Sequence, residues 1–438
     1  MWLAVWASGC SLLVPGSGGY VESRTDAGPD GGPPPLPDGG SCPGTLTLCD
    51  GACYDLTSDE AHCGRCEVAC GTGEECRASV CVDPVVDLSV GPSHSCVVRG
   101  SGQVWCWGNN VEGQLGDGTV IPSNVPVRVQ GIDEAIRVSA GGMTFRDPLG
   151  STCAVRRNGE VRCWGSNYSG QLGDGTTMRS LMPLVVPGLP PIATVHSGFA
   201  FACGVSTTQR PYCWGTLVPT GTLGRAAEVV APGVSGPWVE FLDASCHHAC
   251  AVTAAATVMC FGDNNAGEVG ADPTTLPETA QFRLVSGVDG ALDVAAGPVS
   301  SCATLTNGEV WCWGAESALG IGSSTATPHP TPARVSGISD AVAVETGPFA
   351  PTNCAIRGAR RTLSCWGRNL MDPAMGSTSS PIDVAGLAGV QRVALGATHA
   401  CALLEGGLVR CWGDNTNGLL GDGTSDPRWT PGPVTGLP

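Results

Sequence analysis

The chain has 438 residues, of which 39 are acidic and 22 basic, and its formal net charge is −17. All the basic residues are arginine, because the sequence contains no lysine. An acidic chain without a basic tract repels nucleic acid phosphates, so we expect no nucleic acid partner. The 24 cysteines indicate an oxidising compartment, because reduced compartments rarely hold disulfide-rich proteins.

Residues 1–10 form an apolar stretch that runs into small residues and Cys10. This pattern resembles the end of a bacterial lipoprotein signal, which implies that Cys10 carries the lipid of the mature protein. The stretch lacks a positive n-region and is shorter than the usual length of about 15–30 residues, so we expect the true start to lie upstream. The alternative is a fortuitous apolar terminus with a stray cysteine. No stretch reaches the roughly 18 apolar residues of a membrane-spanning helix, so we expect membrane contact only through the lipid.

Residues 11–41 are dominated by Gly, Pro, Ser and Asp, a composition that predicts a disordered linker. A linker after a lipidated cysteine would hold the folded part away from a membrane. We therefore expect an outer-membrane-anchored lipoprotein of the cell envelope, or an extracellular protein.

Residues 42–83 form a small cysteine-rich module that cannot build a sufficient hydrophobic core alone, so we expect four disulfides of open connectivity. Its cysteines are Cys42, Cys49, Cys53, Cys63, Cys66, Cys70, Cys76 and Cys81. The sequence resembles a small module of myxobacterial surface proteins. The spacing of Cys63 and Cys66 also allows a zinc site, an alternative that the export signal disfavours.

Residues 84–438 contain seven copies of one short pattern, in which two β-rich segments flank a Gly-containing turn. The first cysteines of successive copies lie 47 to 57 residues apart, a period typical of propellers or solenoids. Opposed residues of an antiparallel hairpin lie within disulfide reach, so we expect each hairpin to hold its own bridge. The pairs are Cys96/Cys106, Cys153/Cys163, Cys203/Cys213, Cys250/Cys260, Cys302/Cys312, Cys354/Cys365 and Cys401/Cys411. Asn158-Gly159 and Asn307-Gly308 predict two-residue turns.

Each hairpin is followed by a Gly-rich tail, a Pro-x-x-Val segment and a small strand, which gives about four strands per repeat, the content of one propeller blade. The sequence therefore predicts an all-β fold: a seven-bladed β-propeller, preceded by the disulfide-rich module and the linker. The tail motif Trp-Gly-x-Asn with Gly-Gln-Leu-Gly or Gly-Leu-Leu-Gly is well preserved in the first, second and seventh copies, at Trp107, Trp164 and Trp412.

These residues, with Gly-x-x-His before the hairpin, resemble the regulator-of-chromosome-condensation repeat, whose family forms seven-bladed propellers. The resemblance covers roughly residues 84–438 and points to a secreted bacterial type. It implies that strands from both ends share one blade, with residues 430–434 supplying a strand that the first blade lacks. The family includes secreted propellers that inhibit β-lactamases by surface contact, and a founding member that exchanges nucleotide on a small GTPase.

Three sets of residues are candidates for chemistry. Cys246 and His247 have metal-ligand types, but they are too few for a site, and we expect Cys246 to be free or locally bridged. His94, His248 and His399 recur at one repeat position, which indicates packing or hydrogen bonding. Asp117, Asp174 and Asp422 lie between glycines, where Asp is a turn residue, and a calcium site needs more converging oxygens.

The sequence therefore predicts a protein that is not an enzyme, has no cofactor and is a monomer. We expect a surface-displayed scaffold whose propeller loops bind a protein or a glycan. The alternatives are a regulator resembling a guanine-nucleotide exchange factor, by family analogy, and a polysaccharide-acting enzyme with carboxylates around the central channel.

Overall fold

The computed structural model describes residues 42, 44–49, 52–142, 149–216, 227–228, 241–244, 248–323, 327–347, 351–368 and 376–437. Cys10, the linker, Cys246 and His247 lie outside these residues. The chain divides into two compact units, of which the first contains residues up to Ala69 and Cys76–Val80, and the second contains Cys70–Glu75 and Cys81–Pro438. The division runs through a short hairpin of β3 (Glu75–Arg77) and β4 (Val80–Val82).

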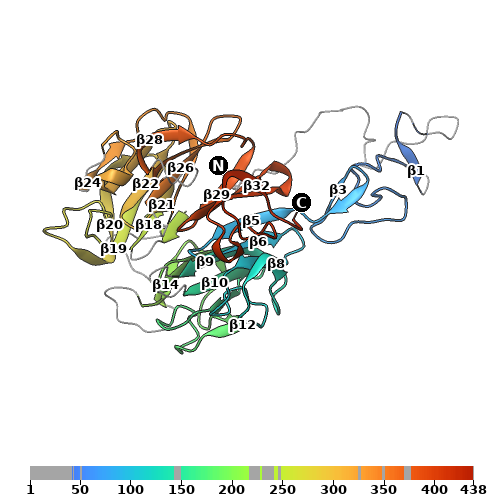
Figure 1. The fold of residues 1–438 in the computed structure, drawn as a ribbon, viewed down its shortest axis with the longest axis horizontal. Coiled ribbons are helices and arrows are strands. Elements are labelled where there is room, and N and C mark those ends of the chain that lie inside the picture. Colours follow the sequence, from blue (N-terminus) through green and yellow to red (C-terminus); the bar gives the residue numbers. More distant parts are fainter. Residues whose placement is uncertain are drawn as a thin grey trace, which may run out of the picture. The chain divides into compact units, whose positions relative to one another are not determined.

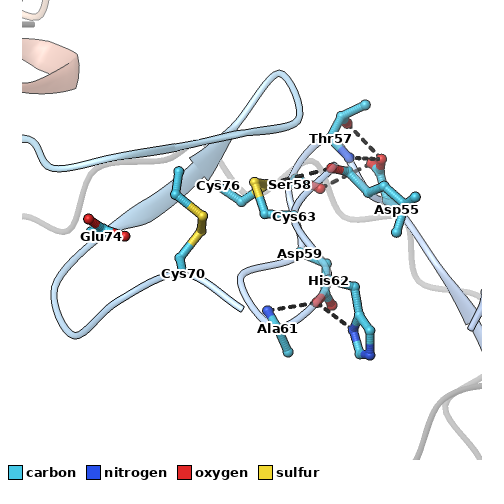
Figure 2. Close-up of a disulfide and its surroundings, with 12 residues drawn as sticks. Asp55, Thr57, Ser58, Asp59, Ala61, His62, Cys63, Cys70, Glu74 and Cys76 are labelled. Carbon is cyan, nitrogen blue, oxygen red and sulfur yellow. Dashed lines mark hydrogen bonds and ion pairs between the residues drawn. A yellow bond between two sulfur atoms is a disulfide. The ribbon is translucent and has the colours of Figure 1, made fainter. Parts of the chain in front are cut away.

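The first unit contains the antiparallel strands β1 (Thr47–Cys49) and β2 (Ala52–Tyr54). It holds the disulfides Cys42–Cys53, Cys49–Cys66 and Cys63–Cys76, and the second unit holds Cys70–Cys81. Figure 2 shows the Cys63–Cys76 bridge beside two turns, in which Asp55 accepts the main-chain N–H of Thr57 and Asp59 contacts His62 at 3.0 Å. Because Cys63 and Cys66 both lie in disulfides, they offer no thiolate for the zinc alternative.

The second unit contains seven antiparallel sheets of four strands each, which confirms the predicted all-β, seven-bladed propeller. Blades 1 to 4 are formed by β5 (Val85–Val90), β6 (His94–Arg99), β7 (Val104–Gly108), β8 (Ser123–Arg128); β9 (Ala135–Gly142), β10 (Gly150–Arg156), β11 (Val161–Gly165), β12 (Ser180–Val185); β13 (Ile192–Ser197), β14 (Phe201–Ser206), β15 (Pro211–Gly215), β16 (Ala227–Glu228); and β17 (Phe241–Ala244), β18 (His248–Val252), β19 (Thr257–Asp263), β20 (Glu278–Asp289).

Blades 5 to 7 are formed by β21 (Ala291–Ala296), β22 (Ser300–Leu305), β23 (Val310–Ala315), β24 (Pro328–Arg334); β25 (Ala341–Thr346), β26 (Thr352–Arg357), β27 (Thr362–Arg368), β28 (Ser377–Asp383); and β29 (Val390–Leu395), β30 (His399–Leu404), β31 (Val409–Gly413), β32 (Arg428–Pro433). Short 3-10 helices are η1 (Glu316–Ala318), η3 (Glu405–Gly407) and η4 (Thr416–Gly418). No helix among the described residues is long and apolar enough to cross a membrane.

The core consists of seven separate apolar clusters, one between each pair of neighbouring blades. The cluster between blades 1 and 2, for example, contains Cys96 and Val98 of blade 1 with Ala154 and Trp164 of blade 2. A fully buried tryptophan belongs to most of these clusters, and blade 4 has Phe261 at that position. Each blade is therefore stabilised mainly by burial against its neighbours.

The first strand of each blade contacts the first strands of both neighbouring blades, so these strands surround the axis of the ring. Each such strand has one edge without a partner strand. Side chains of the preceding blade accept hydrogen bonds from that edge: Asp87 accepts the N–H of Val138 at 2.8 Å, and Ser89 accepts that of Ala140 at 2.9 Å. Unpaired buried main-chain groups are costly, so these bonds stabilise the inner edges.

A disulfide joins the second and third strands of every blade, between directly opposed residues. The bridges are Cys96–Cys106, Cys153–Cys163, Cys203–Cys213, Cys250–Cys260, Cys302–Cys312, Cys354–Cys365 and Cys401–Cys411, with Cα–Cα distances of 4.0–4.1 Å. Nearly all these cysteines are buried in the clusters between blades, so the bridges also contribute apolar surface to the core.

The prediction of two-residue turns at Asn158-Gly159 and Asn307-Gly308 is wrong, because each loop has three residues. Gly159 N–H donates to Arg156 O, and Arg156 N–H donates to Glu160 O, so the loop has three residues and Gly159 follows the two central positions. Gly159 has a φ of +83°, the left-handed conformation that this glycine position requires. The turn at Gly308 has the same bonds.

The expected closure by shared strands is also wrong. The last strand, β32, pairs with β31 of blade 7, and blade 1 obtains all four strands from residues 85–128. Blades 7 and 1 instead meet through side chains, with β29 beside β5 (Figure 1). Trp107 Nε1 donates to Leu419 O at 2.9 Å, His399 shares a 2.9 Å hydrogen bond with Ser95, and Arg392 pairs with Asp87.

Five outer strands carry a proline three residues before a buried valine that directly follows the strand. These prolines are Pro126, Pro183, Pro332, Pro381 and Pro431. Proline at a sheet edge removes a donor and opposes pairing with another strand. Blade 4 has Phe282 at this position, and its ring packs edge-on against Phe261, with ring centroids 4.6 Å apart. Phe282 thus fills volume beside the smaller ring that replaces tryptophan.

The closure bond of Trp107 gives a first prediction. Replacing Trp107 with Phe leaves the buried Leu419 carbonyl without its donor, which should cost about 1–3 kcal/mol of unfolding free energy. Urea unfolding followed by circular dichroism measures this loss. The control Trp105→Phe alters a partly buried ring whose Nε1 lies 3.4 Å from Gln103 Oε1, and it should cost less. Equal stability of wild type and Trp107→Phe would contradict the role of this bond.

The buried histidines give a second prediction. Burial lowers the pKa of His94 to about 3 and that of His399 to about 4, whereas in the unfolded chain the pKa stays near 6.5. Below about pH 6.5 the unfolded state therefore binds protons that the folded state does not, and stability falls as pH falls towards 4. His399→Gln should remove up to about 3 kcal/mol of this decline, measured by urea unfolding at a series of pH values. If His399→Gln leaves the pH dependence of the unfolding free energy unchanged, the lowered pKa of His399 does not cause this decline.

Candidate binding surface

A buried asparagine organises the loop between the third and fourth strands of blade 1, residues 109–122. The side-chain N–H groups of Asn110 donate to Asp117 Oδ1 at 3.1 Å and to Ile121 O at 3.0 Å. Its Oδ1 accepts the N–H of Leu115 at 3.0 Å. One side chain thus satisfies main-chain groups on both arms of the loop, which fixes the loop conformation.

The same arrangement recurs in blades 2 and 7, in residues 166–179 and 414–427. Asn167 donates to Asp174 at 3.1 Å and accepts from Leu172, and Asn415 donates to Asp422 at 3.2 Å and accepts from Leu420. Blade 4 keeps the asparagine as Asn264, but its loop follows a different course after Gly270. The three intact motifs of the sequence therefore correspond to three loops of one design.

The neighbouring blade packs against each of these loops. Gly116 has a φ of +67°, and a Cβ there would lie 2.6 Å from Trp164 Nε1 of blade 2. A Cβ at Gly173 would likewise clash with the ring of Trp214, and a Cβ at Gly421 would clash with the ring of Trp107. Trp164 Nε1 also donates to Gln114 O of the blade 1 loop at 2.9 Å. The first glycine of the Gly-Asp-Gly motif is thus required by close packing on the next blade.

The aspartates of these loops accept hydrogen bonds within the loops. Both carboxylate oxygens of Asp117 accept from Thr119, and one also accepts from Asn110. For Asp422, burial raises the pKa, but hydrogen bonds from Thr424 and Asn415 and the charge of Arg428 outweigh it, and the pKa lies below its ordinary value. The carboxylate therefore stays ionised at neutral pH.

The loops of blades 7, 1 and 2 are neighbours in the ring, and direct bonds connect them. Asn124, after the blade 1 loop, exchanges hydrogen bonds with Gly423 of the blade 7 loop at 2.8 and 2.9 Å. Arg179 of the blade 2 loop donates to Val111 O of the blade 1 loop at 2.9 Å. Residues 109–122, 166–179 and 414–427 therefore form one surface, which we call the three-loop surface.

Large apolar side chains are exposed on the blade 1 and blade 2 parts of the three-loop surface. Met178 is 75% exposed, Ile121 68% and Tyr168 60%, and Val111 and Val120 are also exposed. The bonds of Asn110 to Ile121, of Asn167 to Met178 and of Arg179 to Val111 bring these segments together. Exposed apolar groups gathered in this way mark interaction sites.

The three-loop surface is also acidic. Its sequence contains six acidic residues and one basic residue, Arg179. Glu112 is nearly buried and lies 3.7 Å from Arg179, so this pair contributes no free positive charge. The other acidic residues are Asp117, Asp174, Asp414, Asp422 and Asp426, of which Asp426 is exposed and the others are half-buried. An apolar part thus adjoins a part with a net negative charge.

The recurring histidines are buried in the contacts between blades. His94 Nε2 donates to Thr152 Oγ1 of blade 2 at 2.8 Å, and Thr152 in turn donates to Gln114 O. His248 makes the same contact with Ser301 of blade 5 at 2.8 Å. The packing and hydrogen-bonding interpretation agrees with these bonds.

The exposed apolar residues were not predicted from the sequence. Val111 and Tyr168 occupy the variable position after Trp-Gly-x-Asn, and Ile121 and Met178 follow the conserved threonine by two residues. A large apolar residue at two loop positions in consecutive repeats was the available signal. The contribution of blade 7 to this surface could not be predicted from the sequence. Residues 414–427 are distant in sequence from the other two loops and adjoin them only in the closed ring.

Comparison with known proteins places these features in context. A protein-family model described as "Regulator of chromosome condensation (RCC1) repeat" matches residues 101–144. A second family model of the same description matches residues 85–114, 150–171 and 390–419. Residues 39–87 match the stigma-specific STIG1-like protein family. The cysteine-rich module thus has a match of its own.

Curated relatives include the E3 ubiquitin-protein ligase HERC2 of Mus musculus, 26% identical over 77% of this chain but only 7% of the ligase. The secretion-regulating guanine nucleotide exchange factor of Bos taurus is 25% identical over 80% of this chain and 71% of its own length. This chain therefore spans a small fraction of the ligases that it matches.

Among solved structures, human WBSCR16 superposes with a TM-score of 0.66 at 20% identity, covering 76% of this chain and 94% of that one. Prp20p of Saccharomyces cerevisiae superposes with a TM-score of 0.63 at 17% identity, covering 80% and 87%. Likeness at this identity shows the fold. With the matches to three of the seven blades, it supports the regulator of chromosome condensation (RCC1) repeat family for the propeller of this chain.

Proposed function

We propose that the propeller is a non-catalytic scaffold that binds a protein or glycan partner through the three-loop surface. The observation that carries this proposal is the group of exposed apolar side chains on loops fixed by buried asparagines. A partner that covers these side chains removes apolar area from water without ordering a flexible loop, so the cost of binding is low. Met and Tyr side chains suit such contacts, because one is adaptable and the other amphipathic.

The proposal includes export to the cell envelope or beyond it. Every cysteine among the described residues lies in one of eleven disulfides, and so many bridges are typical of oxidising compartments. A lipid on Cys10, a monomeric state and a bacterial source remain part of the proposal, on the sequence argument alone.

The alternatives have less support. Similarity to an exchange factor at 25% identity favours nucleotide exchange, but that activity belongs to reducing compartments, in which these disulfides would not form. A polysaccharide-acting enzyme needs paired carboxylates in a cleft. On the inner strands, the carboxylates of Asp87 and Asp293 instead accept main-chain N–H groups of the next blade, so these carboxylates are engaged in joining blades.

The scaffold proposal predicts binding without turnover. Purified full chain is incubated with a glycan array and with surface proteins of the source cells, and the products are analysed by mass spectrometry. We expect saturable binding, unchanged ligands, and a loss of about tenfold or more in Tyr168→Ser/Met178→Ser. The matched control is Leu284→Ser, which removes a side chain that is 58% exposed on the outer strand of blade 4. Conversion of any glycan by the pure protein would refute the scaffold.

The compartment gives a separate prediction. Peptide mapping under non-reducing conditions, on protein from its native cells, should find the seven blade disulfides closed and Cys10 lipidated. Free thiols at these positions with an unmodified Cys10 would place the protein in a reducing compartment and restore the exchange-factor alternative.

A further inference from the structure

The three-loop surface combines two chemistries that together restrict its partner. This inference rests on the proposed function, because it names the partner class of the same surface. The apolar part lies on blades 1 and 2, with Ile121, Tyr168 and Met178 the most exposed side chains. The acidic part includes Asp414, Asp422 and Asp426 of blade 7, which the bonds between Asn124 and Gly423 hold beside blade 1.

Arg179 and Arg428, the arginines of these loops and of their edge, are already engaged. Arg179 donates to Val111 O and lies 3.7 Å from Glu112. Arg428, at the edge of the blade 7 loop, contacts Asp422 at 3.0 Å and donates to two main-chain carbonyls. Asp426 has an exposed side chain, whose carboxylate accepts no hydrogen bond from the described residues. The surface therefore presents negative charge that a partner can neutralise.

Charge complementarity excludes several occupants. A second copy of this chain would bring the same acidic loops together, and like charges at an interface cost free energy. Anionic glycans and nucleic acids are repelled for the same reason, and a neutral glycan can donate hydroxyls to the carboxylates but brings no positive charge to neutralise them. A positively charged partner with apolar side chains satisfies both parts.

We infer that the three-loop surface binds a protein segment in which aliphatic or aromatic side chains adjoin lysine or arginine. The apolar side chains cover Ile121, Tyr168 and Met178, and the basic residues meet the carboxylates of blade 7, with Asp426 the most accessible. Binding of this kind loses affinity as salt rises, because exposed charges are screened over about 8 Å at physiological ionic strength.

The test uses a library of random linear peptides displayed on phage and selected against the full chain. Selected peptides are then synthesised, and their affinities are measured by fluorescence anisotropy at about 50 mM and about 500 mM salt. We expect the selected sequences to combine apolar residues with Lys or Arg. Affinity should fall about tenfold or more in Tyr168→Ser/Met178→Ser, and severalfold in Asp426→Asn and at the higher salt concentration.

Two matched controls lie outside the surface. Leu284→Ser and Glu278→Gln change exposed side chains of β20 and should leave the affinity unchanged. Selected peptides that are acidic, or that bind the Tyr168/Met178 variant as tightly as wild type, would overturn the inference, as would a library that yields no binder. A glycan that binds the wild type and is lost in that variant would overturn the inference and leave the scaffold proposal intact.

Discussion

A buried tryptophan N–H of one blade donates to a main-chain carbonyl of the preceding blade, and much of the molecule depends on this bond. It is present with Trp107, Trp164, Trp214, Trp313 and Trp366, at distances of 2.8–3.1 Å. The accepting carbonyl of Gln114 or Leu419 belongs to a loop of the three-loop surface. The bond that joins blades therefore also fixes the candidate binding loops, and the apolar side chains on them rest on a rigid base.

The individual blades have modest stability of their own, because they are rich in glycine and small residues, which have low strand propensity. The structure compensates at each edge of a blade. Side chains of the preceding blade accept from the inner edge, the disulfide joins the two central strands, and proline protects most outer edges. A disulfide that closes a loop of about ten residues also restricts the unfolded chain, which stabilises the fold by roughly 2–3 kcal/mol in the entropic description.

The number and the content of the blades could be predicted from the sequence, because each repeat carries a complete set of strand and turn signals. The closure was mispredicted, because the family resemblance suggested strand exchange and the sequence has no local signal for which partner β32 selects. The pairing of Phe261 with Phe282 also needed the structure, since the two residues lie on different strands and compensate in volume. For the same reason, the contiguity of the blade 7, 1 and 2 loops became visible only in the closed ring.

The contiguity of each blade in sequence has a consequence for how such a chain changes over generations. All four strands of a blade come from one segment of the chain, and no sheet of the described strands mixes the two ends. A tandem duplication or deletion of one repeat therefore adds or removes an entire sheet, with its own disulfide and its own loop, and leaves no strand orphaned. New surfaces can arise by copying a blade whose loop already folds and then altering the few exposed positions of the copy.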